Sequence, residues 1–390
     1  MSQLDDRSVT EDHEVIMSLD PLDADEVYRK LPDVNREGDV AALIETLRTL
    51  AERARGPVAA FSRYEAVAAT RDLGFILGSI KRLGLEPVQV VPEVEPVLLA
   101  LRDLTGMVPR ETVYHYSIWN PTGRRQRSFT GDPQEDALIA SVRLSLAKLA
   151  GAVARGPSLH ELPLLDPQFA SSAKKVADGL QGLEESIDLV IREVSPVFFA
   201  RVLRPYFDDV RIGEERYTGG AGAGLPVPLI DLILWASDQP DPAYEAFWRG
   251  GVPYTLPAWQ RLYDVVDRQP SMVTRLVTAL RTVRPSGTVP RDLQASALAI
   301  ERCLRALVIF RAKHLTIARK AYQADLRLYS VGSSGGDTDL LDRILLSARD
   351  NVTLVRDMGY FSREHGVRGT GAHVVPRDWP ASAAGSSGIG

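Results

Sequence analysis

The 390-residue sequence is poor in metal-binding and disulfide-forming side chains, with a single cysteine, Cys303, and six histidines. One cysteine excludes a disulfide framework and any zinc or iron–sulfur site built from several cysteines. The N-terminal residues MSQLDDRSVTEDHEV are acidic and polar, and lack the basic start and apolar stretch of a signal peptide. We therefore expect a protein of the reducing, cytoplasmic compartment.

Long apolar runs and a strong charge of either sign are also missing. No apolar run approaches the ~20 residues that a helix needs to cross a bilayer, so we expect no membrane partner. The formal net charge is −5 at pH 7, which gives the whole chain no attraction for nucleic acid. Hydrophobic residues make up 45% and charged residues 25% of the chain, the balance of a globular protein.

Helical periodicity dominates the sequence. Apolar residues recur every three or four positions in 39–55, 64–84, 91–104, from Pro133 onward, and again in 173–203, 257–268, 270–283 and 290–322. Asp39 is a typical residue to start the first of these helices. The turn-rich passage 108–132 interrupts the pattern, and its alternation around Tyr114 and Ile118 favours a short extended piece. The sequence therefore predicts an all-α fold.

The same pattern suggests a division of the chain. Residues 1–18 contain few apolar side chains and are predicted to be a disordered acidic tail. Residues 19–107 are expected to form a small N-terminal helical subdomain, and 108–363 a larger helical domain. The Gly/Ser-rich end, 364–390, is predicted to be a flexible tail.

His314 lies on the longest predicted helix, within one apolar stripe. The stripe consists of Ile300, Leu304, Leu307, Phe310, His314, Ile317 and Ala321. A neutral imidazole in this position can offer a nitrogen to a haem iron, and Arg311 on the same face can pair with a haem propionate. A lone histidine on an apolar face is more often a hydrogen-bonded core residue, so the periodicity alone leaves both interpretations open.

Several long blocks around and before this helix carry a family resemblance, from about Leu22 to Leu346. They are RDLGFILGSIKRLG, EPVLLALRDL, VPRETVYHYSIWNPTG, RQRSFTGD, LRPYFDDVRIGEERYTGG and FRAKHLTIARKAY. In these blocks the sequence resembles the monodechloroaminopyrrolnitrin synthase family and, more distantly, indoleamine and tryptophan 2,3-dioxygenases. The resemblance implies the helical haem-binding fold of the indoleamine 2,3-dioxygenases, with haem b as cofactor and O2 as co-substrate.

The resemblance also implies which residues hold the cofactor. His314 matches the histidine that is the only protein ligand of the haem iron. Arg311 matches a residue with a propionate or structural role, supported by Asp231. The glycine loop TGGAGAG, which contains Gly222, matches a segment that runs close to the haem; it is no phosphate-binding loop, because Leu-Pro follows it.

A second set of residues is implied to contact the substrate. Ser141 matches the distal-side serine of the dioxygenases, and Arg204 matches the arginine that holds the substrate carboxylate. Tyr322 and Ser333 match a tyrosine and a serine that contact the amino-acid end in the synthase family. Each residue also has a purely structural alternative. Ser141 would be a small helix residue and Arg204 a partner in an ion pair. Tyr322 would be a helix-end residue and Ser333 a turn residue.

Three further residues are candidates for the distal pocket. His115 and Trp119, in HYSIWN, are expected within reach of this pocket, although a structural role is favoured for His115. Ala137, followed by Leu138, stands where the dioxygenases carry paired aromatic residues. This departure implies an indole pocket of different shape and puts plain 2,3-dioxygenation in doubt.

The predicted function is haem-dependent oxidation of the indole ring of tryptophan or 7-chlorotryptophan, with rearrangement to an aminophenylpyrrole. Tryptophan 2,3-dioxygenation, or monooxygenation of another indole, is the first alternative. A non-catalytic helical binding protein is the second. The expected partners are the small-molecule substrate and an electron donor.

Overall fold

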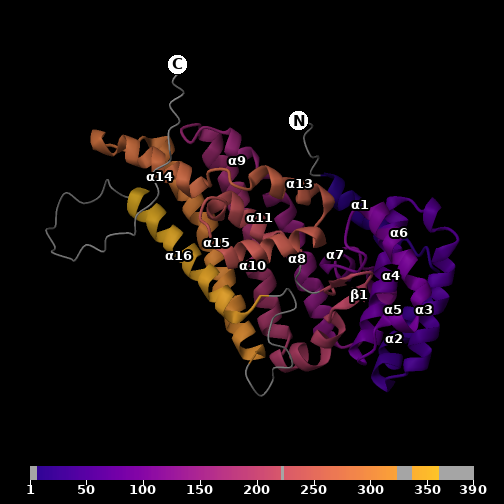
Figure 1. Cartoon of the computed structure of the whole chain (residues 1–390). Coiled ribbons are helices and arrows are strands. Elements are labelled where there is room, and N and C mark those ends of the chain that lie inside the picture. Colours follow the sequence, from indigo (N-terminus) through magenta and orange to yellow (C-terminus); the bar gives the residue numbers. More distant parts are fainter. Residues whose placement is uncertain (1–6, 221–223, 323–335, 360–390) are drawn as a thin grey trace.

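The computed structural model describes residues 7–220, 224–322 and 336–359, and it is built almost entirely of helices (Figure 1). In the first part of the chain the helices are α1 (Arg7–Ser18), α2 (Asp25–Glu37), α3 (Val40–Arg55), α4 (Arg63–Arg82), α5 (Pro87–Val90), α6 (Glu95–Thr105), α7 (Val113–Tyr116) and α8 (Pro133–Arg155). They continue with α9 (Ser158–Glu161), α10 (Pro167–Glu193), α11 (Val227–Asp231), α12 (Pro242–Gly251), α13 (Pro257–Val266), α14 (Met272–Val283), α15 (Arg291–Ala321) and α16 (Thr338–Gly359). The predicted all-α class is confirmed.

The strands of the described part form one small hairpin. Strand β1 (Val210–Ile212) pairs antiparallel with β2 (Glu215–Tyr217), with Val210 opposite Tyr217. Two π-helical turns stand out as well, η4 (Phe198–Leu203) and η6 (Leu232–Ala236). Such turns are rare in proteins overall, and those that do occur often lie near functional sites. Here each adjoins a residue singled out in the sequence, because Arg204 follows η4 and Asp231 precedes η6.

Local signals define several helix ends. The Asp39 side chain accepts a hydrogen bond from the Ala42 amide at the start of α3, as the sequence predicted. Ser62 and Glu65 form a reciprocal capping box at the start of α4. Between residues 113 and 116 the chain forms a short helix, so the expected extended piece is wrong there. The reason is local, since Thr112 and His115 cap this turn.

The N-terminal helices α2 to α6 gather on one side of the molecule, and the long C-terminal helices lie on the other (Figure 1). The N-terminal helices have their own apolar core, which includes Leu47, Leu73 and Phe75. This core also takes in Phe129 and Tyr206 from later in the chain. The two parts of the protein therefore share side chains across the boundary that the sequence suggested near residue 107.

Close packing of α8, α10 and α15 positions the C-terminal half. At Gly182 of α10 an added Cβ would meet the Lys148 Cβ of α8 at 2.7 Å, so glycine allows the two helices to approach. Helices α10 and α15 are joined by the ion pairs Asp178–Arg302 and Asp188–Lys313, at 2.7 and 2.8 Å. Because the paired residues advance together along both helices, α10 and α15 run parallel.

The prediction of a disordered tail over residues 1–18 is wrong for residues 7–18, which form α1. Ile16 is 2% exposed and packs in the main core, and its carbonyl accepts a hydrogen bond from buried Arg71. These tertiary contacts compensate for the low apolar content of the segment. The predicted C-terminal tail, 364–390, lies outside the described residues.

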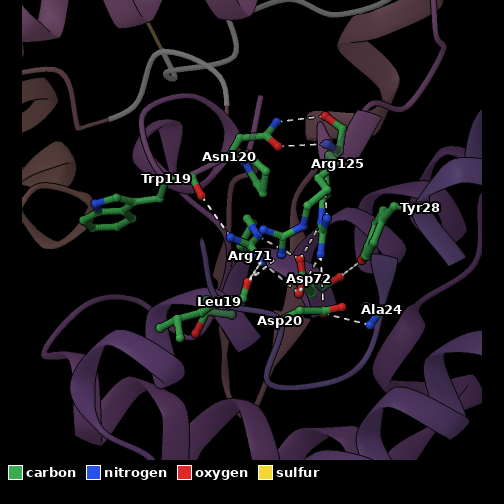
Figure 2. Close-up of polar contacts among 12 residues, drawn as sticks. Leu19, Asp20, Ala24, Tyr28, Arg71, Asp72, Trp119, Asn120 and Arg125 are labelled. Atoms are coloured by element: carbon green, nitrogen blue, oxygen red, sulfur yellow. Dashed lines mark hydrogen bonds and ion pairs between the residues drawn. The ribbon is translucent and has the colours of Figure 1, made fainter. Parts of the chain in front are cut away.

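A group of charged side chains ties α1, α2 and α4 to the segment before α8. We call it the charge cluster; it consists of Asp20, Asp25, Arg71, Asp72, Arg125 and Arg127 (Figure 2). Its centre is Asp72, whose carboxylate lies 2.8 Å from Arg71 Nε and 3.0 Å from Arg127 Nε. All three of these side chains are 0% exposed. The paired opposite charges of the cluster therefore hold together segments that are distant in the sequence, namely α1, α2, α4 and the segment before α8.

The stretch Pro133–Glu161, which comprises α8 and α9, is long and apolar enough by length and composition to cross a membrane. The stretch was not expected from the sequence, because charged residues such as Arg143 and Lys148 interrupt its apolar residues. Core helices of globular proteins have the same composition, and α8 here packs against α10 through Gly179 and Gly182. The stretch alone therefore supports no membrane assignment.

Candidate active-site cavity

A cavity of about 330 Å³ lies among α8, α10, α15 and the start of α16. Its walls are largely apolar, with Val142, Ile187, Val190, Phe310 and Ile317 among the lining residues. The residues with polar side chains that line it are Tyr116, Ser141, Ser186, Ser195, His314, Arg319, Tyr322, Asp337 and Thr338. An apolar pocket with a few convergent polar groups is typical of a small-molecule site.

His314 lines this cavity, where its imidazole is neutral. Burial, with a further contribution from the positive charge of Arg311, lowers the pKa of His314 from 6.5 to about 4. The Phe310 ring lies parallel to the imidazole, with ring centroids 5.7 Å apart. Among the described residues, no side chain or backbone group hydrogen-bonds either ring nitrogen. The helical periodicity left two interpretations open, a hydrogen-bonded core histidine and a haem ligand. The first does not fit, because His314 makes no such hydrogen bond to a described residue.

Arg311 and Asp231 are paired, as the resemblance implied. Arg311 Nη1 lies 3.0 Å from Asp231 Oδ1, and Arg311 Nη2 contacts the other carboxylate oxygen. The indole nitrogen of Trp235 donates to the same carboxylate at 2.9 Å, and the Tyr244 hydroxyl donates as well. Arg311 is not among the residues that line the cavity, and its charge is neutralised by Asp231. The geometry favours its structural role, whereas a propionate contact stays a prediction.

Tyr322 and Arg204 are brought together at the C-terminal end of α15. Tyr322 lines the cavity, and burial raises the pKa of its hydroxyl, although the nearby Arg204 guanidinium opposes the shift. Arg204 is 7% exposed, does not itself line the cavity, and bonds Asp208 at 2.8 Å. A tyrosine hydroxyl backed by a buried cation suits the carboxylate of a ligand. Their substrate roles remain predictions.

The helix α8 contributes Ser141 but not Ala137. Ser141 lines the cavity, and its hydroxyl donates to the Leu138 carbonyl at 2.7 Å. Ala137 packs against the N-terminal core, and the adjacent Leu138 lines the cavity in its place. Leu138, and not Ala137, therefore faces the cavity, because successive side chains on a helix point about 100° apart.

His115 and Trp119 do not line the cavity. The Thr112 amide donates to His115 Nδ1 at 3.0 Å, and burial lowers the pKa of His115 to about 3. Its ring packs edge-to-face on Trp119, with centroids 4.8 Å apart. A neutral, buried ring that caps a turn fits the structural role favoured for it, and the distal-pocket prediction for both residues finds no support in this geometry.

Two predicted residues, Ser333 and Gly222, lie outside the described residues. Their neighbours in the chain do reach the cavity, because Gly220 and Gly336 line it. At Gly220 an added Cβ would meet the Tyr116 Cβ at 2.9 Å, so glycine allows this loop to pass closely.

Two polar residues were not expected from the sequence: Ser186, which lines the cavity, and Glu135, whose carboxylate is buried. Glu135 accepts hydrogen bonds from the Ser128 hydroxyl, the Phe129 amide and the Thr130 amide, at 2.7, 2.9 and 2.8 Å. The Tyr116 hydroxyl donates to it at 3.2 Å. The block RQRSFTGD thus folds around one carboxylate, a contact that residue spacing alone does not reveal.

A comparison with known families adds to this geometry. Residues 12–360 match the family described as monodechloroaminopyrrolnitrin synthase PrnB. The chain belongs to this family. The match spans every helix that lines the cavity, from α7 to α16, and it confirms the resemblance seen in the sequence blocks. Membership of this enzyme family implies a small-molecule substrate.

Proposed function

We propose that this synthase-family protein is a haem-dependent enzyme. Its predicted reaction is oxidation of the indole ring of tryptophan or 7-chlorotryptophan, with rearrangement to an aminophenylpyrrole and loss of CO2. The single observation that carries the proposal is His314, a neutral imidazole in a mostly apolar cavity with both ring nitrogens uncommitted among the described residues. O2 and an external electron donor complete the reaction, in a cytoplasmic setting.

The residues present fit a haem. A haem iron takes the lone pair of a neutral imidazole, and the lowered pKa keeps His314 in that form at pH 7. Apolar side chains such as Val190 and Ile317 suit the macrocycle, and Arg319, which pairs with Asp342 at 3.3 Å, is a cation among the lining residues. When bound, haem b supplies the redox chemistry by which O2 reacts with the electron-rich C2–C3 edge of an indole.

The protein's own contribution is orientation and exclusion of water. Tyr322, with Arg204 behind it, is proposed to hold the carboxylate of the substrate, and Ser333 to hold the amino-acid end with them. The apolar walls around Val142 and Ile187 keep the indole ring dry. Fixed geometry lowers the entropic part of the barrier. The proposed chemistry, which the haem would supply, requires no strong base among the side chains of the cavity.

Visible spectroscopy of the haem-supplemented protein tests the proposal. The wild-type protein should show a Soret band, and His314→Ala should lose or shift it. His160→Ala is a matched control, because burial also lowers the pKa of His160 to about 4, yet His160 does not line the cavity. A wild-type protein without a Soret band, or an unchanged band in His314→Ala, would favour the non-catalytic binding protein.

Product mass separates the predicted reaction from dioxygenation. Ring cleavage to a formylkynurenine-type product adds two oxygen atoms and keeps the carboxylate, whereas the aminophenylpyrrole has lost CO2. Spectral titrations with tryptophan and with 7-chlorotryptophan identify the substrate, since only a ligand that enters the cavity should shift the haem spectrum. A product two oxygens heavier would establish the dioxygenase alternative.

A further inference from the structure

Ser186 on α10 differs from the other serines of the cavity. The Ser141 hydroxyl donates to the Leu138 carbonyl at 2.7 Å, and the Ser195 hydroxyl accepts from the Phe198 amide at 3.1 Å. Ser186 is 9% exposed and lines the same cavity, but no described residue hydrogen-bonds its hydroxyl. A hydroxyl that faces a cavity and bonds no described residue is available to a water molecule or to a group that arrives with the ligand.

The position of Ser186 relates it to His314. Lys313 bonds Glu184 at 3.0 Å and Asp188 at 2.8 Å, which are the residues two before and two after Ser186. Ser186 and His314 therefore lie at the same level of two packed, parallel helices. Both side chains line the same cavity, and neither has a hydrogen-bond partner among the described residues.

We propose that Ser186 is a positioning residue for His314, an inference that rests on the proposed haem-binding function. A histidine that binds a metal through one nitrogen keeps a proton on the other, and that N–H is held by a hydrogen bond in most metal sites. The Ser186 hydroxyl accepts this N–H, either after rotation of its side chain or through one water molecule. The bond fixes the ring orientation and makes the imidazole a stronger donor.

The rate of haem loss to an excess of haem-free globin, together with the reduction potential, tests the inference. Ser186→Ala should lose haem about tenfold faster, the lower end of the effect of removing such a partner. Its reduction potential should rise, because a less basic imidazole stabilises the ferric state less. The matched pair Ser186→Thr and Ser186→Val has the same shape, so Thr should behave like the wild type and Val like Ala.

Ser145→Ala is the control for loss of a buried hydroxyl, because Ser145 is 3% exposed, bonds the Val142 carbonyl at 3.0 Å and does not line the cavity. Equal haem loss and equal potentials for the Thr and Val variants would overturn the inference while leaving haem binding intact. A wild-type protein that takes up no haem would instead overturn the proposed function, and this inference with it.

Discussion

The charge cluster around Asp72 and the cavity beside His314 are both largely buried, but they treat polar groups in opposite ways. In the cluster, each fully buried charge faces an opposite charge, and Arg71 also bonds the Trp119 carbonyl at 3.0 Å (Figure 2). In the cavity, the imidazole of His314 and the hydroxyl of Ser186 have no hydrogen-bond partner among the described residues. An unpaired buried polar group costs stability. We therefore assign the paired cluster a structural role and the unpaired groups of the cavity a role in ligand binding.

The largest expected effect lies in the cluster. Asp72→Ala leaves Arg71 and Arg127 buried beside each other without their shared carboxylate, which should cost about 3–5 kcal/mol of unfolding free energy. Urea denaturation measures it. The control is Asp33→Ala, whose ion pair with Arg36 is on the surface and should contribute less than about 1 kcal/mol. Equal losses for the two variants would contradict an architectural role for the cluster.

Asp231 tests a buried ion pair close to the cavity. Asp231→Ala leaves Arg311 buried without its partner and should cost about 3 kcal/mol. The double variant Asp231→Leu, Arg311→Met removes both charges and should recover most of that loss in urea denaturation. If the double variant folds stably but takes up haem poorly, Arg311 has a propionate role as well as a structural one.

His115 should make stability depend on pH. The pKa of His115 is about 3 in the folded protein and about 6.5 for a solvent-exposed histidine, so between these values the unfolded chain binds a proton that the folded protein does not. Stability is therefore lost as the pH falls from 6.5 towards 3, by up to about 1.4 kcal/mol per pH unit. His115→Asn keeps an acceptor for the Thr112 amide and should flatten this slope, as measured by denaturation at pH 7 and pH 5. An unchanged slope would exclude His115 as its source.

The smallest effect on stability is expected inside the cavity. Val190→Phe places the added ring in empty space, and should therefore cost less unfolding free energy than the about 1–3 kcal/mol typical of overpacking a filled core. The same change should abolish the spectral response to tryptophan in the haem-loaded protein. Ile191→Phe is the control, because Ile191 is 48% exposed and next to it on α10. A filled cavity that still responds to tryptophan would place the ligand elsewhere.

Local patterns predicted the helices well. The helix expected over 290–322 is α15, Arg291–Ala321, and the one expected from Pro133 begins there. The predicted helix over 173–203 is α10, which ends at Glu193, three residues before Pro196. Helix α1 was missed because its order depends on distant partners, above all Arg71. Helix-forming signals are local and can be read from sequence, whereas such contacts cannot.

The candidate site was predicted less completely, for the same reason. His314, Ser141 and Tyr322 line one cavity, as the family resemblance led us to expect. Ser186 was missed because a serine in a helix carries no signal that its hydroxyl will lack a partner. His115 and Trp119 were placed too close to the ligand, since distance along the chain does not say which side of a short helix faces a cavity.

By itself, the sequence determined the all-α class, the long helix that carries His314 and, through its blocks, the synthase family. Only the tertiary structure decided which polar groups are hydrogen-bonded within the protein and which are available to a ligand. Arg311 is paired with Asp231, a residue 80 positions earlier in the chain, while His314, one turn later, faces the cavity and hydrogen-bonds none of the residues that the structure describes. The physical reason is that periodicity gives the face of a helix, but hydrogen bonds depend on what the rest of the fold brings against that face.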